Sequence, residues 1–397
     1  MNICAFGRSL PIHQLGGMEY HFEELTQALR QKGHDITIIT THHPHGIEYE
    51  KKNGVDIYYL KKTLPGRYEF GFWKESIKKF MELKKIKKFD LIWSESIGGY
   101  GYLKEKIRKH FNLPVVLTAH GTFSGQLITK LKKSIFSPKT ILGVLKNLYG
   151  YKLERKIYPH VDFIIAITQI VARALVKYFN ITPEKIHIVP NGIDVEKFRP
   201  DNNLRNSFRK KLGLREDEPI ILSAGRLHYA KGVQMIISAI PSVLEQIPVK
   251  LIVIGEGNYE KKLRQLVQKL DIGDRVTFLG LVPREKLTGY YNACDLFVLP
   301  TLEQESLPLA LLEAMACEKP VVTSEIIELP SVQENKTSGI ILKASTGKTI
   351  AQAIITVLKD KKLADSLAKR GREKVTREYS FEKSVNEIET LFMQTVK

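Results

Sequence analysis

Cysteine and long apolar runs are scarce or absent in this sequence. Its three cysteines, Cys4, Cys294 and Cys317, stand far apart among 397 residues and form no CxxC pair. Isolated cysteines make neither a disulfide framework nor a metal-binding set, so we expect reduced thiols in the protein core. No apolar run reaches the roughly 18 residues that a membrane-spanning helix needs, so no such helix is expected.

Signals for secretion and for metal chemistry are also missing. The opening residues MNICAF lack the basic start and apolar core of a secretory signal, so we expect a cytoplasmic protein. No DxD, HExxH or Walker A motif occurs. The histidines of HHPH, residues 42–45, are close enough to share a metal, but we predict an exposed loop there. We therefore expect neither a bound metal nor a separate cofactor.

Acidic residues are outnumbered, since 61 lysines and arginines face 43 aspartates and glutamates, for a formal charge of +18. A basic balance favours an anionic partner, such as nucleic acid, acidic lipid or a phosphorylated small molecule. Two segments, 74–88 and 130–156, concentrate the excess and interleave it with apolar residues. Such helices lie in a membrane interface or present a solvated face, and both interpretations stay open. No DNA- or RNA-binding motif is present, so we expect no nucleic-acid partner.

Short apolar runs alternate with helical patterns along a chain that is too long for one core. The runs are 3–6, 35–40, 55–60, 91–95, 114–120 and 162–168, then 219–225, 249–257, 275–280, 295–300, 320–324 and 339–343. Runs without polar alternation indicate strands buried on both faces, as in parallel sheets between helices. We therefore predict an α/β protein of two doubly wound, Rossmann-like domains, 1–195 and 196–379, with a polar linker at 195–218 and a helix at the end.

Two cations follow the first strand of the second half. In SAGRLHYAKG, residues 223–232, the strand ends at Ala224-Gly225, and Arg226 and Lys231 come next. Ligands of open parallel sheets bind at the carboxyl ends of the strands, so both side chains are expected at a cleft between the domains. An arginine fork and a lysine point charge suit a diphosphate leaving group where no metal is present.

Two features of the first half point to the same cleft more weakly. Gly16-Gly17 closes the loop after the first strand and opens a helix, where paired glycines let the backbone approach an anionic ligand. A plain tight turn explains the pair equally well. His120 ends the run 114–120 at its carboxyl edge, although a lone histidine is more often structural than functional.

The stretch ESLPLALLEAMA, residues 305–316, carries Glu305 and Glu313 eight residues apart. With Ser306 as a cap and Pro308 in the first turn, it predicts a helix. Eight residues rise about 12 Å along a helix, which is too far for two carboxylates acting on one glycosidic bond. The pair could instead bracket an elongated ligand, with phosphate at the helix N-terminus between them. Glu313 has apolar neighbours, where an unpartnered carboxylate is costly, so a functional role is favoured.

These motifs resemble, in order and spacing, the family 4 (GT4) retaining glycosyltransferases of the GT-B fold, also called glycosyl transferases group 1. The resemblance rests on GGMEY, LTAHG, VPNGID, AGRLHYAKG, VTFLGLVP and the stretch from ACDLFVLP to ACEKPVV, and it covers nearly the whole chain. Its most specific part is the second half, where Glu305 and Glu313 form an E-x7-E pattern. It implies an N-terminal acceptor-binding domain, 1–195, a C-terminal donor-binding domain, 196–379, and a last helix, 380–397, that crosses back onto the first domain.

The resemblance also implies a reaction and the residues that perform it. A hexose, such as glucose or mannose, would move with retention and without a metal from a UDP- or GDP-sugar to a cytoplasmic, lipid-linked or glycan-precursor acceptor. The implied site consists of Arg226 and Lys231 on the diphosphate, Glu305 on the sugar hydroxyls, Glu313 on the ribose, His120 beside the transferred sugar, Gly16 and Gly17 near the phosphate, Val282 on the base, and the backbone amides of Ser306, Leu307 and Leu309. The segments 74–88 and 130–156 would add contact with an anionic membrane surface, peripheral at its inner face.

The sequence departs from the family pattern in three places. Pro308 stands where a glycine is usual and removes one N–H, Glu318 replaces the glycine of ACGxP, and Ile327 and Glu328 replace two glycines in the loop Ser324–Ser331. These changes keep open a divergent sugar-nucleotide-binding protein without transferase activity. A nucleotide-dependent oxidoreductase is a weaker alternative, because neither FGRSLPIHQLGG nor VIGEGN completes a GxGxxG fingerprint.

Overall fold

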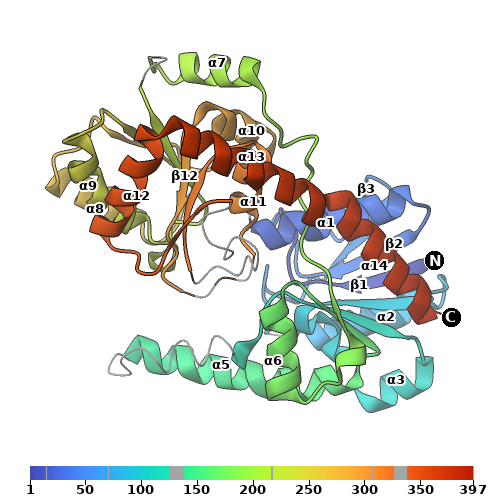
Figure 1. Ribbon diagram of the computed structural model, residues 1–397. Helices are drawn as coiled ribbons and strands as arrows, with labels where there is room; N and C mark the ends of the chain where they lie inside the picture. The colour runs from blue at the N-terminus through green and yellow to red at the C-terminus, as the bar shows by residue number, and fades with distance from the viewer. Residues whose placement is uncertain are drawn as a thin grey trace. The chain divides into compact units, whose positions relative to one another are not determined.

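The computed structural model describes residues 1–14, 16–69, 71–124, 138–215, 218–303, 305, 307–325 and 338–396. The chain forms two compact units, one of Met1–Asn191 with Ser384–Lys397 and one of Gly192–Lys383. Each unit is an α/β layer structure built on its own sheet (Figure 1). The prediction of an α/β protein with two parallel-sheet domains is therefore confirmed.

Unit 1 contains an eight-stranded sheet in the order β3-β4-β2-β1-β5-β6-β7-β8. Its strands are β1 (Asn2–Phe6), β2 (Asp35–Thr40), β3 (Tyr49–Lys52), β4 (Val55–Tyr59), β5 (Leu91–Glu95), β6 (Val115–Ala119), β7 (Phe163–Ala166) and β8 (Ile186–Ile188). Its helices are α1 (Gly17–Gln31), α2 (Phe72–Lys84), α3 (Glu105–Phe111), α5 (Pro138–Ile157), α6 (Gln169–Phe179) and most of α14 (Phe381–Val396), with the 3-10 turns η1 (Ser96–Gly101), η2 (Tyr158–His160) and η3 (Pro183–Lys185). All of these strand pairs are parallel except β3 with β4.

Unit 2 contains a six-stranded parallel sheet in the order β11-β10-β9-β12-β13-β14. Its strands are β9 (Ile220–Ala224), β10 (Lys250–Ile254), β11 (Val276–Phe278), β12 (Leu296–Leu299), β13 (Val321–Ser324) and β14 (Ile340–Leu342). Its helices are α7 (Asn202–Lys211), α8 (Val233–Leu244), α9 (Glu260–Lys269), α10 (Arg284–Ala293), α11 (Leu309–Ala316), α12 (Gly347–Lys359) and α13 (Lys361–Glu378), with the 3-10 turn η4 (Tyr229–Lys231).

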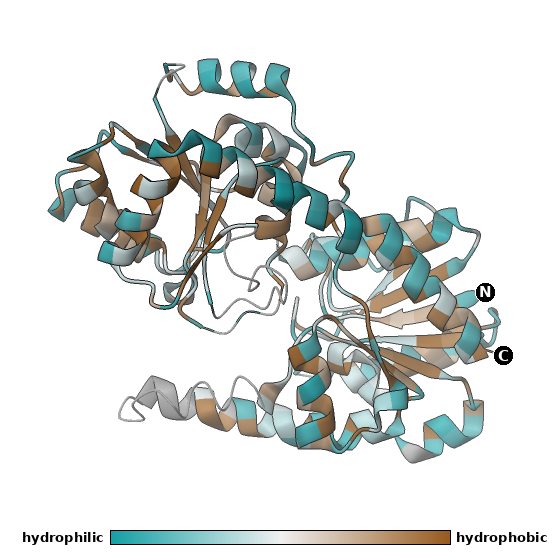
Figure 2. Ribbon diagram, viewed as in Figure 1, coloured by the Kyte–Doolittle hydropathy of each residue, from teal (hydrophilic) through white to brown (hydrophobic). Residues whose placement is uncertain are grey.

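The sheet of unit 2 is buried on both faces, as its apolar strands predict. Ile220 and Leu222 of β9 belong to one apolar cluster, whereas Ile221 between them belongs to another. Because successive side chains of a strand point to opposite faces, the two clusters are the two cores of a doubly wound sheet. Figure 2 shows apolar strands in both sheets, with helices of mixed hydropathy around them.

The last helix, α14, packs in unit 1 through apolar and charged contacts. The Phe392 ring lies 5.5 Å from that of Trp93, and the Ser384 hydroxyl donates to the Pro190 carbonyl at 2.7 Å. Glu389 forms ion pairs with Lys32 at 2.7 Å and with His34 at 2.9 Å. Residues from two distant parts of the sequence thus complete one unit.

The structure corrects the expected linker at 195–218. Residues 202–211 of that segment form α7, which packs on α10. Arg205 and Arg209 both bind Asp295, at 2.5 Å and 3.1 Å, and the Phe208 ring packs 5.0 Å from that of Tyr290. Two arginines and one phenylalanine attach this helix to unit 2, so its sequence lacks the repeating apolar positions by which a helix is usually recognised. The helix was therefore not predicted.

Two smaller expectations in unit 1 were incomplete. Strand β3 was not predicted, although Asn53-Gly54 joins it to β4 with both residues at positive φ, 50° and 81°. That dipeptide is the usual signal of a tight hairpin turn. His43 of the HHPH loop is buried against Tyr59, with ring centroids 4.7 Å apart, so the loop is not exposed throughout.

Two predictions about composition can be compared directly with the structure. All three cysteines are buried and free, which confirms that they are reduced core residues. Within the described ranges, no helix combines the length and the apolar character needed to cross a membrane.

Candidate active site

In unit 2, the loops after β9 and β12 are fastened to each other. The Ala230 carbonyl accepts hydrogen bonds from the Thr301 hydroxyl at 2.8 Å and from the Leu302 N–H at 2.7 Å. Gly232 has a φ of +74°, and a Cβ atom there would lie 2.1 Å from the Pro300 carbonyl oxygen. Only glycine permits this approach, so the sequence motif AKG is required to bring the two loops together.

The close packing of these two loops places Lys231 next to Glu305. The Lys231 ammonium contacts Glu305 Oε1, and both side chains are about three-quarters buried. Glu305 Oε2 is buried and accepts no hydrogen bond from any described residue. A buried carboxylate oxygen without a donor is costly, so this atom is well suited to accept a ligand hydroxyl.

Arg226 lies on the same loop as Lys231 but is exposed. Its guanidinium makes no hydrogen bond or ion pair with the described residues. The structure therefore brings Lys231 and Glu305 together and leaves Arg226 available to an anion from solvent.

The glycines of VIGEGN serve backbone packing between neighbouring loops. A Cβ atom on Gly255 would lie 2.0 Å from the Gly225 carbonyl oxygen, and one on Gly257 would lie 2.1 Å from that of Leu227. The Leu227 N–H donates to the Glu256 carbonyl at 2.9 Å, and the Gly255 N–H to that of Gly280 at 2.8 Å. These glycines let the loops after β9, β10 and β11 pack closely, which accounts for them without a dinucleotide fingerprint.

Glu313 is buried in unit 2 with partners on both carboxylate oxygens. Arg284 donates to Oε1 at 2.9 Å, and the Tyr291 hydroxyl donates to Oε2 at 2.7 Å. Burial, together with the Glu313 carboxylate, raises the pKa of the Tyr291 phenol well above its ordinary value. Arg284 and Tyr291 thus offset the cost of burying Glu313, so its apolar neighbours do not by themselves require a ligand. Its role at the ribose stays a prediction.

Helix α11 begins at Leu309, later than expected. Its N-cap is Pro308, in extended conformation at φ −73° and ψ 115°, with no side-chain hydrogen bond. The expected cap, Ser306, lies outside the described residues. Leu307 and Leu309 are buried, and the N–H of Leu309, at the first helical position, has no partner within the helix. Val282 follows β11 and is partly buried against the same apolar cluster.

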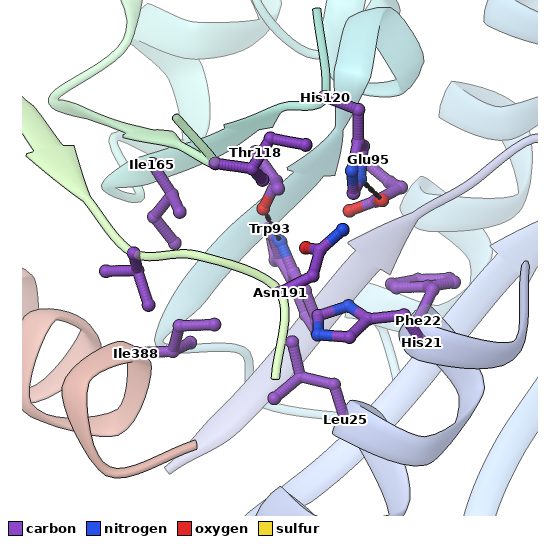
Figure 3. Close-up of a pocket in the computed structure, with 12 residues that line it drawn as sticks. His21, Phe22, Leu25, Trp93, Glu95, Thr118, His120, Ile165, Asn191 and Ile388 are labelled. Atoms are coloured by element: carbon purple, nitrogen blue, oxygen red, sulfur yellow. Dashed lines mark hydrogen bonds and ion pairs between the residues drawn. The ribbon is translucent and has the colours of Figure 1, made fainter. Parts of the chain in front are cut away.

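In unit 1, His120 at the carboxyl end of β6 meets Glu95 at the carboxyl end of β5. His120 Nε2 contacts Glu95 Oε1, with the two side chains 6% and 12% exposed. Figure 3 shows this pair beside a small pocket that His21 and Asn191 also line. Ser96, directly after Glu95, has a φ of +51°, a strained backbone of the kind that collects at functional sites.

The loop after His120 is held by α5. The buried Glu154 carboxylate accepts the Phe123 N–H at 2.9 Å and the Tyr158 hydroxyl at 2.8 Å. Burial raises the pKa of Glu154 to about 8, against the lowering effect of those hydrogen bonds. A Cβ atom on Gly150 would lie 2.5 Å from the Phe123 ring, so this glycine makes room for the ring on the helix.

The paired glycines predicted at the phosphate stand at the start of α1. Gly16 is its N-cap, in extended conformation, and Gly17 is its first residue. Beside them Glu19, 4% exposed, accepts a hydrogen bond from the Ser9 hydroxyl at 2.9 Å. Glu19 lines a second pocket of unit 1 together with Arg8, Tyr68 and Glu95.

The described residues contain no group of three or more histidine, cysteine, aspartate or glutamate side chains that could hold a metal ion. The paired side chains described above at the candidate site are Lys231–Glu305 and Arg284–Glu313 in unit 2 and His120–Glu95 in unit 1.

Comparison with known proteins identifies the family. Residues 205–374 match the model of glycosyl transferases group 1, and residues 15–197 match that of glycosyltransferase family 4. The chain belongs to this glycosyltransferase family. The resemblance found in the sequence is thereby confirmed, and the protein is a transferase.

Relatives and solved structures support the assignment of this chain to the glycosyltransferase family. An uncharacterized glycosyltransferase of Methanocaldococcus jannaschii is 26% identical over 396 residues, covering 98% of this chain and 96% of the relative. Alpha-monoglucosyldiacylglycerol synthase of Streptococcus pneumoniae is 28% identical over 313 residues, covering 78% of this chain and 68% of the relative. The structure of Anabaena HepE in complex with UDP and glucose is 18% identical, with a TM-score of 0.79 over 99% of this chain and 100% of that one. The fold is GT-B, as the resemblance implied.

Three site features of this glycosyltransferase were not recognised in the sequence. Glu95 was assigned only to a strand. It ends a buried strand at the same sheet edge as His120, and an acid at that position indicates a site residue. Arg284 and Tyr291 gave no signal, because their partner lies 29 and 22 residues away.

Proposed function

We propose that this glycosyltransferase transfers a hexose, such as glucose or mannose, from a nucleotide-diphosphate sugar with retention of configuration. The observation that carries the proposal is the Lys231–Glu305 pair, in which one buried Glu305 oxygen receives no hydrogen bond from the described residues. A sugar hydroxyl supplies the missing donor, and the lysine beside it supplies a positive charge for a departing phosphate. The UDP and glucose in the HepE complex support a UDP-sugar, and a GDP-sugar remains the second candidate.

The proposed donor contacts follow the order of the donor itself. Glu305 takes the sugar hydroxyls, Lys231 and the exposed Arg226 take the diphosphate, and Glu313 takes the ribose. Val282 contacts the base. The backbone amides of Ser306, Leu307 and Leu309 face the sugar and the phosphate, although Ser306 lies outside the described residues. Gly16 and Gly17 at the start of α1 complete the phosphate side.

The proposed mechanism needs neither a protein nucleophile nor a metal. The bond from the anomeric carbon to the diphosphate oxygen breaks, the acceptor oxygen attacks from the same face, and the departing phosphate takes the acceptor proton. Lys231 and Arg226 stabilise the charge that develops on the diphosphate. His120, held by Glu95, lies beside the transferred sugar and fixes its orientation.

For the acceptor, we propose a lipid-linked molecule or glycan precursor at the cytoplasmic face of an anionic membrane. The Streptococcus pneumoniae relative is an alpha-monoglucosyldiacylglycerol synthase, which supports a lipid acceptor. Helix α5 supports a membrane contact, because Leu145, Leu148 and Tyr149 on its outer side are 57%, 38% and 55% exposed. The next exposed residues on that helix are Lys152, Arg155 and Lys156, and its acid, Glu154, is buried. Exposed apolar side chains followed by cations suit an anionic bilayer interface.

Segment 74–88 supports a membrane contact less well than α5. Its apolar residues Ile77, Phe80 and Leu83 pack inward, so α2 resembles an ordinary surface helix. Ile86, 77% exposed, lies just beyond it. Residues 130–137 of segment 130–156 lie outside the described residues, so α5 alone carries the proposal for that segment.

A second candidate is a sugar-nucleotide-binding protein without transferase activity. Ile327 and Glu328, which stand where the family has glycines, favour it, and both lie outside the described residues. The two functions differ in turnover and not in donor binding.

A donor panel tests the proposal. The purified chain is incubated with UDP-, GDP- and ADP-linked glucose and mannose, with and without a membrane lipid extract and with and without EDTA. Donor binding is measured by calorimetry, nucleotide release is measured over time, and the configuration of the product is read by NMR. We expect one base to support α-linked product in the presence of EDTA. Donor binding without any release would favour the second candidate, and no binding of any donor would refute both.

A further inference from the structure

We propose that Arg284 and Tyr291 are positioning residues that hold the Glu313 carboxylate for recognition of the donor ribose. This inference rests on the proposed function, since it requires a nucleotide donor. The two side chains come from opposite ends of α10 and reach a carboxylate on α11. Arg284 contacts Oε1 at 2.9 Å and Tyr291 contacts Oε2 at 2.7 Å.

The carboxylate keeps free acceptor capacity in this arrangement. An ionised carboxylate has about four lone-pair sites, and one donor on each oxygen leaves one site on each. The two remaining sites match the two neighbouring hydroxyls of a ribose. With its side chain 3% exposed, Glu313 is fixed in one orientation and has little rotamer freedom left to lose when a ligand binds.

Arg284 is itself fixed, and it joins two parts of the predicted nucleoside site. Its side chain is 10% exposed, and its guanidinium carbon lies 5.7 Å from the centre of the Phe198 ring. It is the first residue of α10, two residues after Val282, which is predicted to contact the base. One side chain, Arg284, therefore connects the start of α10, close to Val282, with the Glu313 carboxylate.

The test compares nucleoside diphosphates with and without ribose hydroxyls. Binding of UDP, 2′-deoxy-UDP and 3′-deoxy-UDP is measured by calorimetry, with the GDP and ADP series in parallel, for wild type, Glu313→Gln, Arg284→Gln and Tyr291→Phe. We expect the wild type to prefer the ribonucleotide by at least about tenfold, the effect of one hydrogen bond to a charged group. In each variant the preference should fall toward one.

Two matched controls lie in the same unit. Arg264→Gln removes an arginine that also pairs with a glutamate, Glu260, and lies over a phenylalanine ring, Phe278, at 4.5 Å. Tyr290→Phe removes the neighbouring hydroxyl on α10, whose ring packs on Phe208. Both should keep the wild-type preference. Arg284→Lys, which keeps the charge but not the guanidinium geometry, should restore folding and only part of the preference.

The outcomes separate this inference from the proposed function. If Arg284→Gln and Tyr291→Phe bind both nucleotides more weakly by the same factor, the two residues are structural and the inference is overturned. If the wild type binds ribose and deoxyribose forms equally, Glu313 does not read the ribose, which also overturns it while leaving donor binding intact. If the wild type binds none of the nucleotides, the proposed function itself fails.

Discussion

The Lys231 ammonium contacts Glu305 Oε1 although the two residues are 74 positions apart in the sequence. Lys231→Met would leave the Glu305 carboxylate with no donor on either oxygen among the described residues, and would remove a positive charge from the proposed diphosphate site. We expect the transfer rate to fall about 10²- to 10³-fold, the usual effect of deleting one charge-stabilising donor. Initial rates with the donor identified in the panel measure this. Lys359→Met, which removes an exposed lysine bound to Gln246, is the control. A Lys231→Met enzyme with at least half of the wild-type rate would count against a role at the phosphate.

Glu154 gives the fold a pH dependence whose direction is fixed by its burial. Its pKa rises from the ordinary 4.5 to about 8 on folding, so it stabilises the folded state below pH 4.5 and loses that contribution as the pH rises to about 8. Wild type should therefore lose stability relative to Glu154→Gln across this window, by at most about 1.4 kcal/mol per pH unit. Urea unfolding at pH 5 and pH 8.5 measures the difference. The exposed acid Glu184, changed to glutamine, is the control. Parallel curves for wild type and Glu154→Gln would contradict the assignment.

The outer side of α5 should bind anionic membranes. Leu145→Ser combined with Tyr149→Ser removes two exposed apolar side chains and leaves the buried face of the helix unchanged. We expect wild type to float with vesicles that contain phosphatidylglycerol, less so at high salt, and the double variant to lose most of this binding. Val176→Ser, which removes an exposed apolar side chain of α6 outside both basic segments, is the matched control and should bind like wild type. Equal flotation of wild type and the double variant would exclude this face.

Glu318 occupies a backbone position that suits glycine. It follows the C-cap of α11 with a φ of +55°, its N–H donates to the Met315 carbonyl at 2.9 Å, and the Lys319 N–H donates to that of Ala314 at 3.1 Å. This is the Schellman pattern, in which glycine is preferred. Because Glu318 is exposed, Glu318→Gly removes only the backbone strain and should stabilise the protein by about 1 kcal/mol. Chemical denaturation measures it, and a variant no more stable than wild type would show that no strain is stored there.

The strands could be predicted from the sequence because they are buried on both faces. A run such as 219–225 is apolar at every position of β9 except Ser223, and all five residues of the strand are buried, so composition alone marks it. Helix α7 could not be predicted in this way, since Arg205 and Arg209 anchor it to Asp295 and neither gives an apolar period. Strand β3 could have been predicted from Asn53-Gly54.

The candidate site was predictable where it depends on strand ends and less so where it depends on packing. Lys231 and Glu305 each follow a parallel strand, and neighbouring strands in one sheet bring their ends together. The partners of Glu313 depend on how α10 packs beside α11, which no local pattern records. The burial of Glu313 was therefore foreseen, and the arginine and tyrosine that compensate for it were not.

Glu305 is proposed to bind the sugar that is transferred, so replacing its carboxylate in Glu305→Ala should abolish transfer. Transfer is measured with the donor and acceptor identified for the wild type, alongside Glu303→Ala from the same loop as the control. We expect Glu305→Ala to lose transfer, with an unchanged circular dichroism spectrum, while Glu303→Ala remains active. Full turnover by Glu305→Ala would contradict it.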